Sequence, residues 1–300
     1  TAENFSAVLA GTFTTARAAR RPPWRTISAF FALLLFLLVF GLVRLHRIDH
    51  DRTAASPYRV AAIQAGVVRT GWNPPPDDPQ RLGRYQRLSA QAERDAGPVD
   101  LLVWPEKAYP YPLRSDSRHD YRAGDKHRIR DAFSAPLLFG ASAVDPASRA
   151  LANSAFLLLP DDTLRDVYDK VRLIFYSEHL PSWLSWLAGD RVLYRAGTKV
   201  HPVAPTPLAP LSVFICFEAT FPDHVRQLVA RGGRLLLNLS DDSWFGESAE
   251  PEQHLAHAVF RAIESRRDLV RATGSGVSAF VSAGGEILGR TRLNRYAAEA

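Results

Sequence analysis

The feature that most constrains the fold of this chain is a long stretch without a charged residue. Residues 26–43 read TISAFFALLLFLLVFGLV. At a helical rise of 1.5 Å per residue, this stretch would span about 27 Å, which is close to the hydrocarbon thickness of a bilayer. We therefore expect a transmembrane helix. A buried core helix and a signal peptide are the alternatives, although no small-residue cleavage site follows before Arg44.

The positive charge of the chain is concentrated around this stretch. Residues 1–52 hold seven Arg and three acidic residues, a net charge of +4, whereas the other 248 residues hold 30 basic and 28 acidic residues, a net charge of +2. The nearly neutral larger part argues against nucleic-acid binding. By the positive-inside rule, the basic flank before the stretch places the N-terminus in the cytoplasm and the rest outside. The flanking residues are Arg17, Arg20, Arg21 and Arg25 before it, and Arg44, Arg47, Asp49 and Asp51 after it.

From residue 58 onward, apolar strand patterns alternate with amphipathic helix patterns. This alternation predicts an α/β fold with a mixed sheet and helices packed outside. A polar excursion over 107–135 interrupts the pattern. The expected strands are 58–65, 100–104, 136–144, 154–159, 211–215, 234–239, 269–272, 276–282 and 286–288, and the expected helices are 79–96, 222–231 and 251–267.

The single cysteine is the first candidate for chemistry. One Cys excludes an intramolecular disulfide and a Cys-rich metal site. Cys216 follows the apolar strand 211–215 and precedes a predicted helix, a placement that presents a nucleophile and favours its thiolate. A buried structural cysteine is the alternative interpretation.

Two further charged residues stand at the ends of apolar segments. Glu106 follows the apolar run LLVWP, where a carboxylate could accept a thiol proton. Lys170, in DVYDKVRL, is one of only four lysines among 37 basic residues, so a compact ammonium is a plausible requirement there. Such an ammonium could stabilise an oxyanion and hold Cys216 as thiolate. A surface Glu and a solvated Lys are the ordinary alternatives.

The order Glu, Lys, Cys resembles the carbon–nitrogen hydrolase (nitrilase) superfamily. The matching stretches are RVAAIQAGV (59–67), LLVWPE (101–106), YDKVRL with SEHLP (168–181), ICFE (215–218), LLLNLSDDSWFG (235–246) and residues 253–288. The resemblance implies a nitrilase-like α-β-β-α sandwich over residues 58–300. It further implies Glu106 as general base, Lys170 as oxyanion stabiliser and Cys216 as nucleophile.

The same resemblance implies supporting roles for two more carboxylates. Glu178, in SEHLP, matches an additional active-site Glu that orients the Lys, and Glu218 matches the acidic residue two positions after the nucleophile. Phe175-Tyr176-Ser177 departs from the usual Pro-Phe-Gly before the additional Glu, which leaves substrate preference open. We take Trp183 and Trp186, in an amphipathic loop that could rest at a membrane interface, together with Phe217 and Trp244 as candidate substrate-binding residues. A packed helical turn is the alternative for the two loop tryptophans.

Within the superfamily, the chain most resembles membrane acyltransferases of bacterial lipoprotein maturation. This implies an inner-membrane enzyme with its catalytic domain on the extracytoplasmic side. It would move an acyl chain from a membrane phospholipid, through a cysteine thioester, to the amine of a diacylglyceryl-cysteine lipoprotein. We expect a monomer that needs no organic cofactor. We also expect no metal, because His254 and His257 have no third ligand nearby in sequence.

Two alternative functions stay open at this stage. The chain could be a membrane-anchored amidase or nitrilase, or an inactive membrane-anchored binding module. The resemblance also implies further membrane helices before and after the catalytic domain. We therefore expect residues 1–52 to be the remnant of a larger bundle and the chain to be truncated at both ends, unless it is a shortened paralogue.

Overall fold

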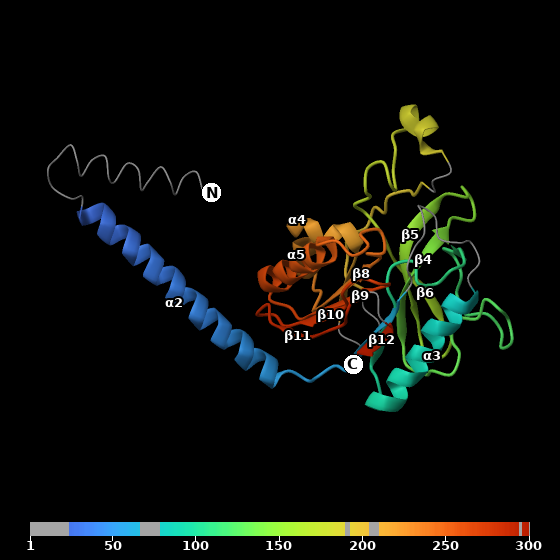
Figure 1. Ribbon diagram of the computed structural model, residues 1–300, viewed down its shortest axis with the longest axis horizontal. Helices are drawn as coiled ribbons and strands as arrows, with labels where there is room; N and C mark the ends of the chain where they lie inside the picture. The colour runs from blue at the N-terminus through green and yellow to red at the C-terminus, as the bar shows by residue number, and fades with distance from the viewer. Residues whose placement is uncertain (1–23, 67–78, 190–192, 204–209, 294–295, 300) are drawn as a thin grey trace. The chain divides into compact units, whose positions relative to one another are not determined.

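The computed structural model describes residues 24–66, 79–189, 193–203, 210–293 and 296–299 (Figure 1). The chain divides into two compact units, Thr1–Ser56 and Pro57–Ala300.

The described part of the first unit is one long helix, α2 (Trp24–Ala54). None of its residues is buried, and the side chains of its apolar middle are exposed. Within the described part of the chain, α2 alone is long and apolar enough to cross a membrane. It contains the span expected at 26–43 and continues to Ala54, where the sequence becomes polar. Of the flanking basic residues, Arg17, Arg20 and Arg21 lie outside the described residues.

The second unit contains two sheets. The first has the strand order β12-β1-β2-β4-β5-β6, with β3 paired to β4, and the second has the order β11-β10-β9-β8-β7. The strands of the first sheet are β1 (Val60–Ala65), β2 (Leu101–Val103), β3 (Leu113–Arg114), β4 (Leu137–Val144), β5 (Leu151–Leu158), β6 (Leu164–Asp169) and β12 (Tyr296–Glu299). Those of the second are β7 (Leu211–Ile215), β8 (Leu235–Ser240), β9 (Leu269–Thr273), β10 (Ala279–Val281) and β11 (Ile287–Arg290).

The two sheets pack face to face. Because successive side chains of a strand point to opposite faces, Val60 and Ala62 of β1 face the second sheet whereas Ala61 and Ile63 face outward. The inner layer joins apolar residues of both sheets, including Leu138 and Leu157 from the first and Leu211, Val213, Ile215, Leu237 and Leu239 from the second. This layer excludes water from the space between the sheets.

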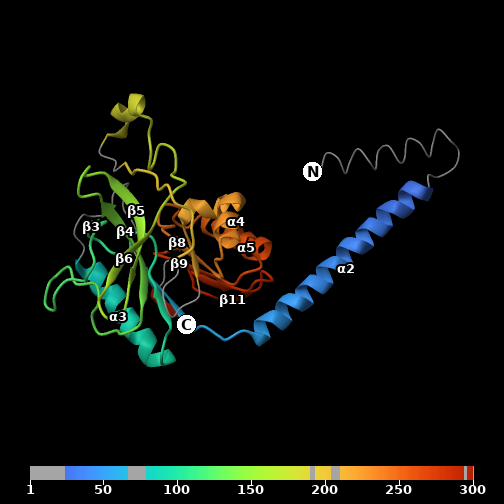
Figure 2. The ribbon, with the colours of Figure 1, turned by 180° about the vertical axis from the view of Figure 1, so that it is seen from behind.

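Helices cover the outer face of each sheet (Figure 2). Helix α3 (Pro79–Ala96) packs Leu82 and Tyr85 on the first sheet, where the Trp104 indole Nε1 donates to Ser89 Oγ at 2.8 Å. Helices α4 (Pro222–Ala230) and α5 (Glu250–Ser265) cover the second sheet. The predicted α-β-β-α sandwich is therefore confirmed.

The strand directions gather several chain segments at one edge. β1, β2 and β4 are parallel, and β6 has the same direction as β4 because both are antiparallel to β5. In the second sheet β7, β8 and β9 are parallel. The segments that follow β2, β6, β7 and β8 all leave the sheets at carboxyl ends, which is where α/β folds place their functional groups.

Three strands were not expected from the sequence. β6, β12 and the two-residue β3 carry no strong apolar run. β6 (LRDVYD) lies at the edge of its sheet, where charged side chains can reach water, so its strand pattern is weak in sequence. The excursion at 107–135 contains only β3 among its described regular elements.

A glycine in β4 makes the turn after β2 possible. A Cβ at Gly140 would lie 2.6 Å from Glu106 Cα, from Lys107 N and from Pro105 O, all of them backbone atoms. We expect Gly140→Ala to lower the free energy of unfolding by about 2–3 kcal/mol, because a backbone clash cannot be relieved by a side-chain rotation.

Urea unfolding of the detergent-solubilised chain, followed by tryptophan fluorescence, measures this change. Gly289→Ala is the matched control, since its Cβ would meet only Phe280 Cδ2 at 3.7 Å. Equal midpoints for the two variants would contradict the expected backbone clash.

Candidate active site

Glu106 is held at the carboxyl end of β2. The chain turns after Val103, and the Pro105 carbonyl accepts a hydrogen bond from Gly140 N at 3.1 Å. This turn directs the Glu106 carboxylate inward, and Glu106 as a whole is only 6% exposed. Its Oε2 accepts a hydrogen bond from Asp241 N at 2.9 Å, which links it to the segment after β8.

Lys170 follows β6 and is fully buried. Its backbone is fixed on both sides, since Lys170 N donates to Asn153 O and Gly197 N donates to Lys170 O, each at 2.8 Å. Its ammonium Nζ lies 2.9 Å from Glu178 Oε1 and 3.3 Å from Glu106 Oε1. One buried cation therefore stands between two buried carboxylates.

Asn153 bridges these two carboxylates. Its Nδ2 donates to Glu106 Oε1 at 2.6 Å and to Glu178 Oε1 at 3.0 Å. Glu178 Oε2 also accepts from Ile174 N at 3.0 Å. These donors fix the positions of both carboxylates around Lys170, which limits the desolvation cost of the cluster.

Cys216 is placed directly after β7 and adopts a left-handed backbone with φ 51°. This region is costly for a residue other than glycine, by about 1–3 kcal/mol, and such strain is common at functional sites. Cys216 is 6% exposed and begins the short 3₁₀ helix η2 (Cys216–Thr220). The charges of Glu106 and Lys170, which contact each other, act on its thiol.

The charges in the site perturb one another. Burial opposes ionisation of Glu106, but the Lys170 and Lys107 charges hold its pKa below the ordinary value. Burial alone would lower the pKa of Lys170, yet Glu106, Cys216 and Glu178 raise it. Burial and the Glu106 charge raise the pKa of the Cys216 thiol. The raised pKa favours the neutral thiol of Cys216, whereas its position in the sequence favoured the thiolate, so a base that accepts the thiol proton would activate it.

Glu218 connects the end of β7, just before Cys216, to the segment that follows Lys170. Its carboxylate accepts from Val171 N at 2.7 Å, from Arg172 N at 2.9 Å and from Ile215 N at 2.7 Å. The Tyr168 hydroxyl donates to the same carboxylate at 2.7 Å. Glu218 thus fixes the segments on either side of the site and does not contact Lys170 Nζ.

The sequence patterns did not point to several groups at this site. Asn153 lies near the start of β5, which is antiparallel to its neighbours and so begins where they end. Lys107 Nζ lies 4.5 Å from the centroid of the Tyr194 ring, and the charge of this second ammonium lowers the pKa of Glu106. The scarcity of lysine, which indicated Lys170, was also a signal for Lys107.

The candidate substrate-binding residues are not all gathered at this cluster. Phe217 packs on the inter-sheet core, and Trp244 is 40% exposed in the turn after β8. Trp183 and Trp186 are 73% and 76% exposed on the 3₁₀ helix η1 (Ser182–Ala188), which projects from the sandwich (yellow in Figure 1).

The two histidines considered as metal ligands lie on α5. His254 is buried with its Nδ1 3.0 Å from Asp242 Oδ1, whereas His257 is exposed. Among the described residues, no group of three His, Cys, Asp or Glu side chains is arranged to hold a metal ion.

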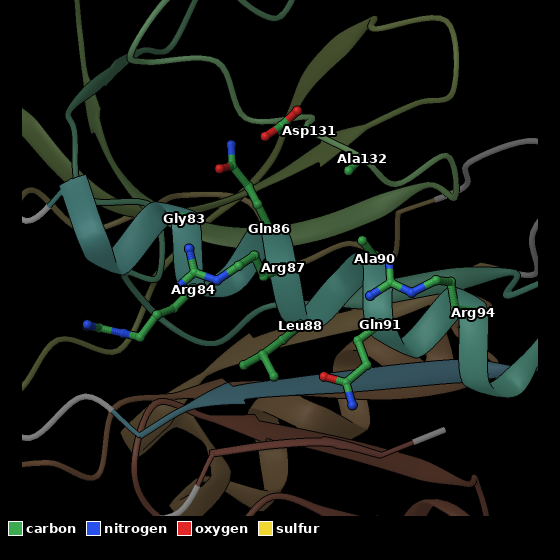
Figure 3. Close-up of a pocket in the computed structure, with 10 residues that line it drawn as sticks. All are labelled: Gly83, Arg84, Gln86, Arg87, Leu88, Ala90, Gln91, Arg94, Asp131 and Ala132. Atoms are coloured by element: carbon green, nitrogen blue, oxygen red, sulfur yellow. The ribbon is translucent and has the colours of Figure 1, made fainter.

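A cavity of about 640 Å³ lies outside the cluster of Glu106, Lys170 and Cys216, against α3 (Figure 3). Its walls include Arg84, Arg87 and Arg94 from the helix and Asp131 from the excursion. None of Glu106, Lys170 and Cys216 lines it. It is thus separate from the site built at the strand ends.

A four-layer sandwich with Glu, Lys and Cys at the carboxyl ends of its strands defines a nitrilase-like protein. The family model described as carbon-nitrogen hydrolase matches residues 59–295. The chain belongs to the carbon–nitrogen hydrolase family, as its sequence resemblance predicted.

Curated relatives specify the branch that the chain is similar to. A Geobacter metallireducens protein named apolipoprotein N-acyltransferase is 33% identical over 92% of this chain and 53% of its own length. A Bradyrhizobium diazoefficiens protein of the same name is 31% identical over 87% of this chain and 50% of its own length. The chain thus spans about half the length of these relatives.

Solved structures support the fold. Nit3 of Saccharomyces cerevisiae, of the nitrilase superfamily, matches with a TM-score of 0.60 and 17% identity, covering 80% of this chain and 88% of Nit3. An amidase from Nesterenkonia matches with a TM-score of 0.55 and 21% identity, covering 80% of this chain and 88% of the amidase.

The second ammonium gives a pH prediction. The Lys107 charge helps to lower the pKa of Glu106, so removing it raises that pKa and protonates Glu106 at a higher pH. We expect Lys107→Met to move the acid limb of the pH–rate profile of Cys216 acylation to higher pH. Lys126→Met, at an exposed lysine of the excursion, is the control and should leave the limb in place.

The Glu218 contacts give a stability prediction. Glu218→Gln replaces an acceptor oxygen by an NH₂ group facing backbone N–H donors, so we expect a loss of about 3 kcal/mol in the free energy of unfolding. Urea unfolding measures it. Glu264→Gln, whose carboxylate is 48% exposed in its pair with Arg261, should stay near wild type. A Glu218→Gln midpoint as high as this control would disprove the role of Glu218 in joining the two segments.

Proposed function

We propose that this chain transfers acyl groups through Cys216, from a membrane phospholipid to the amine of a diacylglyceryl-cysteine lipoprotein. The observation that carries the proposal is the position of the buried Lys170 ammonium between the Glu106 and Glu178 carboxylates beside the only cysteine. The similarity to proteins named apolipoprotein N-acyltransferase supports the choice of substrates.

In the first half-reaction, Glu106 accepts the thiol proton of Cys216, and the sulfur attacks the ester carbonyl carbon. The Lys170 ammonium stabilises the negative charge that develops on the carbonyl oxygen. The tetrahedral intermediate then collapses with cleavage of the C–O bond. The lysophospholipid oxygen leaves with the proton held by Glu106, and an acyl thioester stays on Cys216.

In the second half-reaction, the α-amine of the lipoprotein attacks the thioester carbonyl. Glu106 accepts a proton from the attacking amine, the C–S bond breaks, and the cysteine sulfur regains the proton. The product is an N-acylated lipoprotein. In this scheme Glu178, together with Asn153, positions the Lys170 ammonium, and Glu218 positions the segments that carry Lys170 and Cys216.

We further propose that α2 is a membrane anchor and that the sandwich lies on the extracytoplasmic side of the bacterial inner membrane. The charge bias before the apolar stretch supports this orientation. The exposed aromatic side chains of the segment after Lys170, namely Phe175, Tyr176, Trp183 and Trp186, suit a lipid interface and are candidates to admit the acyl donor. Phe217 and Trp244, nearer to the nucleophile in sequence, are candidates to contact the acyl chain.

An intact-mass measurement tests the reaction. The chain in detergent is incubated with phospholipid, and we expect a mass gain of one acyl group on Cys216. A lipopeptide amine should discharge the adduct faster than water does. Cys216→Ala should show no adduct, and Cys216→Ser should show at least about a hundredfold slower acylation because an alcohol is a weaker nucleophile at neutral pH.

The same measurement distinguishes the alternatives. An adduct formed only from small amides or nitriles would replace the proposal by a membrane-anchored amidase or nitrilase, a possibility that the structural similarity to an amidase keeps open. An inactive binding module predicts no adduct from any of these compounds and no effect of Cys216→Ala in cells beyond stability.

A further inference from the structure

A buried polar network lies behind the nucleophile, in the second sheet. Asp242 and Arg271 form an ion pair in which Arg271 Nη2 lies 2.7 Å from Asp242 Oδ2, with both side chains fully buried. Asp242 Oδ1 also lies 3.0 Å from His254 Nδ1 and accepts a hydrogen bond from the Ser240 hydroxyl at 2.8 Å. Arg271 Nη1 donates to Asn238 Oδ1.

The strand register brings this network to Cys216. β7 and β8 pair in parallel with Ile215 opposite Leu239, so the next residues, Cys216 and Ser240, are neighbours across the two strand ends. Both are buried, and Ser240 is close enough to lower the pKa of the Cys216 thiol. At rest the Ser240 hydroxyl donates its proton to Asp242 Oδ1 at 2.8 Å.

We propose that Ser240 is a switchable hydrogen-bond donor that stabilises the Cys216 thiolate, with Asp242 as its partner at rest. This inference uses only the nucleophile of the proposed function and none of its substrates. When the thiol proton passes to Glu106, the Ser240 O–H rotates from Asp242 Oδ1 to the sulfur. No covalent bond changes at Ser240, and the negative charge on sulfur gains a donor.

The surrounding donors allow Asp242 to release the Ser240 proton. After the rotation, both oxygens of the Asp242 carboxylate still accept hydrogen bonds from Arg271 Nη2, and Oδ1 keeps its contact with His254 Nδ1. Its charge therefore stays neutralised in the interior, where an unpaired carboxylate would be costly. Asp242, Arg271 and His254 act through Ser240 and are positioning residues, whereas Ser240 is the neighbour of Cys216 across the two strand ends.

Gly276 preserves this arrangement. A Cβ there would lie 2.3 Å from Asp242 Oδ2, so only glycine leaves room for the carboxylate that faces Arg271. The segment 240–242 also donates from Asp241 N to Glu106 Oε2. It therefore lies next to Cys216 and contacts Glu106, the carboxylate proposed as the base.

The charged groups that act on the sulfur come from both sheets. Burial, Glu106 and Asp242 raise the pKa of the Cys216 thiol, whereas the Lys170 charge and the Ser240 hydroxyl lower it. Removing the Ser240 hydroxyl deletes a contribution that favours the thiolate and leaves every charge in place. The expected direction is a higher pKa for the thiol and a lower reactivity at a fixed pH.

Alkylation by iodoacetamide tests the inference without any lipid, because Cys216 is the only cysteine of the chain. We expect Ser240→Ala to slow alkylation of the detergent-solubilised chain about tenfold at pH 8 and to shift the pH–rate profile to higher pH. Ser240→Thr, which keeps a hydroxyl, should restore most of the rate. If the added methyl group of Thr is not tolerated, the comparison of Ser240→Ala with its control still decides.

The matched control is Ser212→Ala. Ser212 is also fully buried in this sheet, on β7, and among the residues that the structure describes its hydroxyl has no hydrogen-bond partner, so the same atom is removed without touching the network. Its alkylation rate should equal that of wild type. Equal rates and profiles for Ser240→Ala and Ser212→Ala would overturn the inference. If phospholipid gives no acyl adduct while the Ser240 effect persists, the proposed function fails and the inference stands.

Discussion

The site depends on one interaction, the buried Lys170 ammonium between Glu106 and Glu178. Taking three charges out of water is costly, and the cost is met only when hydrogen bonds satisfy the remaining lone pairs. Asn153, Ile174 N and Asp241 N supply those bonds, and Gly197 N fixes the lysine backbone. These partners come from separate segments of both sheets, so the electrostatics of the cluster require the sandwich to be closed.

This constraint also explains the state of the nucleophile. The charges that keep Glu106 ionised and Lys170 protonated surround a cysteine whose own ionisation is opposed by burial and by the Glu106 charge. The pKa shifts therefore favour a proton on the Cys216 sulfur and a negative charge on the Glu106 carboxylate. Such a division suits a nucleophile that must be activated by proton transfer when an acyl group is bound.

Much of the fold could be predicted from the sequence, because apolar strands alternate with amphipathic helices from residue 60 onward. The edge strand β6 escaped prediction because its charged side chains mask the apolar pattern, although it carries Lys170 to the site. Glu106 and Cys216 were found as a charged and a nucleophilic residue after apolar runs, and Lys170 was found through the scarcity of lysine in the chain. Asn153 and Asp242 were not, because neither an amide near the start of a buried strand nor a carboxylate in a polar turn has a distinctive pattern.

The sequence by itself determined that residues 26–43 form a helix apolar enough for a membrane, because this depends only on local composition. It also determined that Cys216 is the only thiol of the chain. Only the tertiary structure decided which groups meet that thiol. Parallel strands bring residues far apart in sequence to one edge, and the register of β7 and β8 places Ser240 beside Cys216. Burial there sets the protonation of the thiol, because removing water penalises a charge by an amount that depends on its three-dimensional neighbours.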